Sequence, residues 1–152
     1  MTTSQFEKLK KYFHIKELVC KHVYEKHGDK SWQFFDPRML AVLLDIRELI
    51  GKPMVVNNWA KGGNYSQRGL RCNICSLVKE KTSLEKVYIP AHAQGTGFDF
   101  HVPGMTSEEV RKKIERKQVL LSYPIRIERG TEGWVHIDVR TDGLQMITYF
   151  NG

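Results

Sequence analysis

Apolar residues recur at helical spacing throughout the first third of the chain. Two such runs lie in residues 6–13 and 18–23, and a break follows at residues 27–30. Asp36-Pro37 has the pattern of an N-cap followed by proline at the first helical position, and Gly51 is placed to end the helix. The pattern therefore predicts helices up to residue 50, the most regular of them between Pro37 and Ile50.

Beyond residue 50 the pattern favours short strands. Thr106 and Glu109 are spaced as a capping box and predict one further helix, through Ile114 and up to Leu120. Segments with the β-branched or alternating residues of strands lie at 53–57, 84–89, 98–102, 125–128, 134–140 and 146–150. Helices followed by strands predict an α+β fold, with N-terminal helices packed on a mostly antiparallel sheet. We expect a single domain over residues 1–152, because no repeat or long linker divides the chain.

Composition and charge narrow the function classes. The chain has 152 residues, three cysteines and a net charge of +7. The odd, low cysteine count is typical of a reducing compartment, and no apolar run approaches the length of a membrane span. The N-terminus lacks the apolar segment of a secretory signal, so we expect synthesis in the cytosol. The basic charge favours an anionic partner, but no aromatic-basic pattern supports nucleic acid. We expect a monomer that binds neither nucleic acid nor membrane.

Three residues form a candidate metal site. His92 and Asp99 flank Gly95 and Gly97, where the backbone can turn tightly. On the predicted strand 134–140, alternation places His136 opposite to the apolar core face. Two histidines and one carboxylate are a ligand set for catalytic zinc, with one position left open for water. By spacing alone, a hydrogen-bonded structural role for these residues stays open.

The same residues resemble a known family. His92, Gly95, Gly97 and Asp99, followed by Trp-Val-His136-Ile-Asp-Val-Arg, resemble the zinc D-Ala-D-Ala carboxypeptidases and phage L-alanyl-D-glutamate endopeptidases. The hedgehog signalling domain has a similar metal site. The resemblance covers roughly residues 10–140 and implies a hedgehog/DD-peptidase-like fold with zinc on His92, Asp99 and His136. It also implies a peptidase that cuts peptidoglycan stem peptides, in a phage or prophage protein that acts on the cell wall after its release.

Further residues complete the expected active site. Glu128 is the first candidate for the general base, because it precedes the hairpin and shares the face of His136; Glu132 is the alternative. In carboxypeptidases of this family a Ser-Gly-Tyr-Arg motif follows the early strand, but here residues 57–60 lack the arginine. Arg68 and Arg71 are therefore the candidates for binding substrate and the oxyanion. Trp134 is expected to line the substrate cleft.

Two alternatives stay open at this point. The chain could be a zinc-bearing binding or structural module of the same fold without turnover. Cys72-x2-Cys75 has the spacing of a zinc knuckle or redox pair. Because no second cysteine pair or His-x3-His partner accompanies it, the sequence supports neither role for it.

Overall fold

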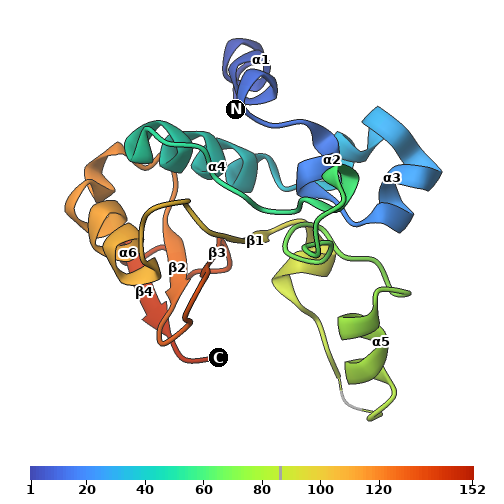
Figure 1. Ribbon diagram of the computed structural model, residues 1–152. Helices are drawn as coiled ribbons and strands as arrows, with labels where there is room; N and C mark the ends of the chain where they lie inside the picture. The colour runs from blue at the N-terminus through green and yellow to red at the C-terminus, as the bar shows by residue number, and fades with distance from the viewer. Residues whose placement is uncertain (86) are drawn as a thin grey trace.

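The computed structural model describes residues 1–85 and 87–152 (Figure 1). The helices are α1 (Thr3–Tyr12), α2 (Ile15–Leu18), α3 (Lys21–His27), α4 (Pro37–Ile50), α5 (Ser76–Thr82) and α6 (Ser107–Arg116). Short 3-10 turns are η1 (Gly28–Phe34), η2 (Trp59–Lys61), η3 (Ala91–Gln94) and η4 (Gln118–Leu120). Over the described residues, none of these helices has the length and apolar character required to cross a bilayer.

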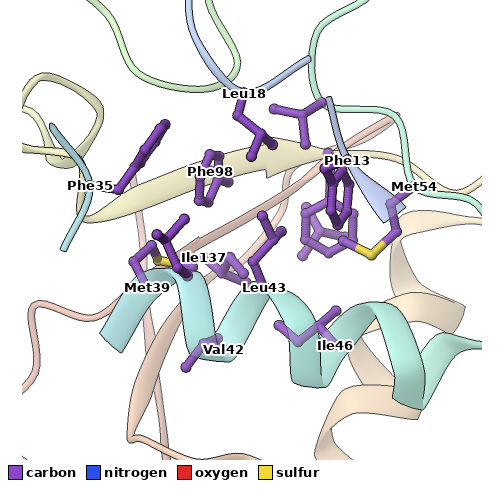
Figure 2. Close-up of a cluster of buried hydrophobic side chains, with 14 of the residues drawn as sticks. Phe13, Leu18, Phe35, Met39, Val42, Leu43, Ile46, Met54, Phe98 and Ile137 are labelled. Carbon is purple, nitrogen blue, oxygen red and sulfur yellow. The ribbon is translucent and has the colours of Figure 1, made fainter. Parts of the chain in front are cut away.

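Helix α4 contributes a large share of the buried apolar core, and its predicted bounds are confirmed. The Asp36 carboxylate accepts a hydrogen bond from the Arg38 backbone N–H, Pro37 takes the first position, and Gly51 adopts the left-handed conformation that ends the helix. Its buried face packs against strand residues such as Phe98 and Ile137 (Figure 2). Helix and sheet therefore share one apolar cluster.

Four strands form a mixed sheet in the order β1-β3-β2-β4. These are β1 (Gly97–Phe100), β2 (Ile125–Glu128), β3 (Val135–Asp138) and β4 (Ile147–Phe150). Strand β3 runs antiparallel to both β1 and β2, whereas β4 runs parallel to β2 at the edge. The predicted α+β class is confirmed, and the sheet is mixed because the chain crosses over before it enters β4.

Two predicted strands are wrong. Segment 53–57 makes a single bridge, between Val55 and His101, because Pro53 has no N–H to donate and the chain turns away after residue 56. In segment 84–89, residue 86 lies outside the described residues and the others form a turn and irregular backbone. Leu84, Val87 and Ile89 are exposed, so burial does not hold them in a sheet.

A long segment between residues 58 and 90 carries α5 away from the sheet (Figure 1). It is anchored near its middle, where Leu70 bridges Val19 in parallel and exchanges backbone hydrogen bonds with Leu18 and Cys20. A side chain at Gly69 would overlap the Leu18 carbonyl, so only glycine permits this approach. Within α5 only Val78 is buried, so apolar packing contributes little to holding it.

Candidate metal centre

The segment between His92 and Asp99 folds tightly because its two glycines are packed against other backbone. Gly95 adopts a left-handed conformation, and its carbonyl accepts a hydrogen bond from the Asp36 N–H. A Cβ at Gly95 would overlap the carbonyl of Phe34, and one at Gly97 would crowd Ala91 and Asp138. The predicted reason for these glycines is confirmed: they let η3 turn directly into β1.

The sheet register brings the predicted ligands together. Asp99 of β1 lies directly opposite His136 of β3, so both side chains project from the same face. His92 comes to them from η3. All three are buried, with 4%, 8% and 7% of their surfaces exposed for His92, Asp99 and His136. Buried ionisable groups need partners, and here they converge on one another.

The spacing of the three ligand atoms is compatible with a metal ion. His92 Nε2 lies 3.3 Å from His136 Nδ1 and 3.3 Å from Asp99 Oδ1. Zinc bonds of about 2.0–2.1 Å in a tetrahedral arrangement would separate neighbouring ligand atoms by about 3.3 Å. The third separation, from His136 Nδ1 to Asp99 Oδ1, is 2.7 Å, the length of a hydrogen bond. Two of the three separations thus match a tetrahedral site, and the third needs a small opening.

The second polar atom of each ligand is held by the protein. His92 Nδ1 donates to the Gly69 carbonyl at 2.9 Å, which leaves Nε2 with its lone pair toward the centre. Asp99 Oδ2 accepts from Arg71 Nη2 at 2.9 Å, and Oδ1 is turned toward the two histidines. Such contacts to the outer atoms orient metal ligands and fix histidine tautomers. The residues therefore fit a bound metal by the chemistry of the donors and by their orientation.

Asp138 plays the same part for His136. It is fully buried and its Oδ2 lies 3.2 Å from His136 Nε2. Arg126 binds Asp138 through two hydrogen bonds, of 2.9 and 2.8 Å, and the Arg140 backbone N–H adds a third, of 2.9 Å. Asp138 thus contacts the ring nitrogen of His136 that is turned away from Asp99.

The charges around the centre follow from this network. Burial lowers the pKa of His92. Burial would also lower the pKa of His136, but hydrogen bonds and charge from Asp138 and Asp99 outweigh it and raise the pKa to about 9. Against a burial penalty, the neighbouring histidines hold the pKa of Asp99 well below its usual range. A metal that binds His136 Nδ1 must therefore displace a proton.

A cleft of about 320 Å³ opens beside Asp99. Its lining includes Tyr65, Arg68, Arg71 and Trp134, so the three residues predicted to bind substrate do come together at one place. The Arg71 side chain also forms the ion pair with Asp99 described above. Arg68 stacks on the Tyr65 ring at 3.6 Å and bonds to His101 Nδ1 at 2.8 Å. The two guanidinium groups therefore have different partners at the cleft: Tyr65 and His101 for Arg68, and Asp99 for Arg71.

The two candidate bases lie in different surroundings. Register pairs Arg126 with Asp138 and Ile127 with Ile137, so Glu128 falls beside His136 on the same sheet face. Its carboxylate lies against Gly152, and a side chain at residue 152 would collide with it. Glu132 is exposed in the hairpin turn and lines a separate depression of about 710 Å³. The structure thus places Glu128, and not Glu132, on the face of the candidate centre.

Two contributors were not predicted from the sequence. The Gly69 carbonyl orients His92, and Tyr65 supports Arg68. A backbone carbonyl leaves no trace in residue type, but Tyr65 three residues before Arg68 is an aromatic–basic pair that the sequence displays. No protein-family model, curated protein or solved structure matches the chain.

Proposed function

We propose that the chain is a zinc-dependent peptidase, with zinc on His92, Asp99 and His136, that hydrolyses amide bonds in peptidoglycan stem peptides. The observation that carries the proposal is the set of three convergent buried ligand atoms, each oriented by a second contact, beside an open cleft. Three protein ligands leave a coordination position open, which is typical of catalytic zinc sites. The ion would supply a Lewis acid that polarises the scissile carbonyl and lowers the pKa of bound water.

The protein groups have separate tasks in this proposal. Glu128, reoriented from Gly152 toward His136, takes a proton from the attacking water and passes it to the leaving amine. Arg68, at the cleft, offers a guanidinium to a substrate carboxylate or to the developing oxyanion. Trp134 is 37% exposed and presents an aromatic surface along which a stem peptide can lie. The family resemblance supplies the substrate class, with D-Ala-D-Ala and L-Ala-D-Glu bonds as the two options.

A non-catalytic zinc-bearing module is the second candidate. It is favoured by one observation: the Glu128 carboxylate is turned toward Gly152, and Glu132 faces another depression. If Glu128 cannot reach the open side of the metal, the cleft binds peptides without cutting them.

The test combines metal analysis with an assay for peptide products released from purified peptidoglycan. The wild type should bind zinc at the centre and release peptides, and His136→Ala should lose both properties. Glu128→Gln should keep its zinc and lose about 100- to 10,000-fold in rate. Glu132→Gln is the matched control and should keep full activity. Zinc without any cleavage would support the binding module, whereas no zinc at His136 would refute the central proposal.

A further inference from the structure

A second group of potential metal ligands lies apart from the first. Cys20, His22, Cys72 and Cys75 place one ligand atom each within 4.8 Å of all the others. Cys20 immediately precedes α3, His22 lies in its first turn, and Cys75 immediately precedes α5. Cys20 and Cys72 are 52 residues apart in the sequence. The pair Cys20 and His22 and the pair Cys72 and Cys75 are each an incomplete ligand set, so the sequence alone does not predict the group. None of these four residues takes part in the proposed peptidase chemistry.

Four of the six separations between these ligand atoms agree with a tetrahedral zinc site. Zinc–sulfur bonds of about 2.3 Å and zinc–nitrogen bonds of about 2.0 Å would place two sulfurs about 3.8 Å apart and a sulfur and a nitrogen about 3.5 Å apart. Cys72 Sγ lies 3.8 Å from Cys20 Sγ and 3.7 Å from Cys75 Sγ. His22 Nδ1 lies 3.5 Å from Cys72 Sγ and 3.7 Å from Cys75 Sγ. All four separations fall within about 0.2 Å of these values.

Other uses of the cysteines explain less of this geometry. A disulfide requires two sulfurs about 2.05 Å apart, and all three cysteines are free. A Cys-x2-Cys redox pair would use Cys72 and Cys75 and leave Cys20 and His22 without a reason to converge on them. Three thiols and one imidazole at one point form a Cys3His set, one of the regular ligand sets of structural zinc.

The backbone around the group is already arranged to hold it. The Cys20 N–H donates to the Leu70 carbonyl at 2.9 Å, which fixes the first ligand beside the segment that carries the other two cysteines. The Cys75 N–H donates to the Cys72 carbonyl at 3.1 Å and closes the turn between them. The ligands thus come from two chain segments that are paired at Leu70.

The geometry assigns a second, structural zinc site to Cys20, His22, Cys72 and Cys75. Four protein ligands close the coordination shell, so this site binds the ion without an open position for substrate. Its role is to fasten the segment between residues 58 and 90 to α3, where apolar packing is sparse.

This second site also positions the first. The Gly69 carbonyl accepts from His92 Nδ1, the Arg71 N–H donates to the His92 carbonyl, and the Arg71 side chain binds Asp99. Residues 69–71 therefore connect the cysteine cluster to two ligands of the other centre. Loss of zinc at the cysteines should loosen these contacts and weaken metal binding at His92 and Asp99, without removing any of their ligand atoms.

Metal content tests the assignment without an activity measurement. Purified wild type should hold two zinc ions per chain, one for each group of ligands. His136→Ala should retain the ion at the cysteines, and His22→Ala should lose it. His27→Ala is the matched control, since it changes a histidine of the same helix outside the cluster and should keep both ions. A folded His136→Ala protein without zinc would overturn the assignment.

Two measurements on the unaltered sequence guard against variants that fail to fold. Cobalt(II) in place of zinc should give intense thiolate-to-cobalt charge-transfer absorption, which His92, Asp99 and His136 cannot produce. Bound zinc should slow alkylation of the cysteines by at least about tenfold, and a chelator should restore it, because zinc-bound thiolates are less reactive. Cobalt binding without this absorption, or alkylation unaffected by zinc, would refute the site and leave the peptidase proposal intact.

Discussion

The orientation of His136 by Asp138 gives the sharpest prediction. Asp138 Oδ1 accepts from Arg126 Nε and the Arg140 N–H, and its Oδ2 accepts from Arg126 Nη2 and lies against His136 Nε2. Asp138→Asn keeps one oxygen and replaces the other by an NH2 group. The amide oxygen should take the Oδ1 place, because the guanidinium and backbone N–H groups there can only donate, whereas His136 Nε2 can become an acceptor. The NH2 group then faces His136 Nε2.

This arrangement selects the wrong tautomer of His136. An NH2 group at the Oδ2 place can only donate, so Nε2 must accept and the ring proton moves to Nδ1, the atom required for the metal. Changes to such outer contacts reduce metal affinity by about 10- to 100-fold. Because the tautomer itself is reversed, we expect the upper end, about 100-fold, which corresponds to about 2.7 kcal/mol.

Competition with a chelator of known zinc affinity measures the effect. Asp142→Asn removes the same charge from an exposed turn and should bind zinc as the wild type does. The cysteine cluster should be unchanged in Asp138→Asn and serves as an internal control, as does the thermal unfolding profile. A folded Asp138→Asn protein that binds zinc within about twofold of the wild type would refute the tautomer argument.

Four further outcomes follow from the structure. Gly69→Ala places a methyl group against the Leu18 carbonyl and should cost about 1–3 kcal/mol in urea unfolding; wild-type stability would contradict the close approach. Asp36→Ala removes the N-cap of α4 and should cost about 1 kcal/mol at neutral pH. Hydrogen bonds from Arg38 lower the pKa of Asp36, so this contribution is complete above about pH 4 and is lost as the pH falls through the lowered value; a cost unchanged in acid would refute it. Arg68→Met should reduce kcat/KM by about 10- to 100-fold with zinc retained, and an unchanged rate would exclude Arg68 from the substrate site. Removal of zinc by a chelator should lower the melting temperature, and added zinc should restore it; an unaffected melting temperature would show that metal does not stabilise the fold.

The sequence predicted the parts of the molecule that local rules govern. The N-cap at Asp36, the stop at Gly51 and the capping box at Thr106 each depend on neighbouring residues, and each is present. The placement of His136 on the non-core face followed from strand alternation, and the structure confirms it. These features need no knowledge of distant contacts.

The rest depends on how distant segments meet. Segment 53–57 has strand-forming residues, but only Val55 finds a partner. Arg71 was expected to face substrate, yet it is tied to Asp99, which only the folded chain brings within reach. Cys72 and Cys75 have no partner nearby in the sequence, because Cys20-x-His22 lies some fifty residues earlier. A contact between residues more than fifty positions apart leaves no local pattern in the sequence from which it could be predicted.

The pairing of Leu70 with the segment around Val19 brings Cys20 close to Cys72, and this has a consequence for how the chain folds. A cross-link between Cys20 and Cys72 closes a loop of about fifty residues, and by the chain-entropy model such a link removes roughly 4 kcal/mol of conformational entropy from the unfolded ensemble. Zinc at the cysteines would then stabilise the folded chain partly by restricting the conformations of the unfolded one. Zinc supply during synthesis would then influence how much of the protein reaches its folded form, before the cleft meets any substrate.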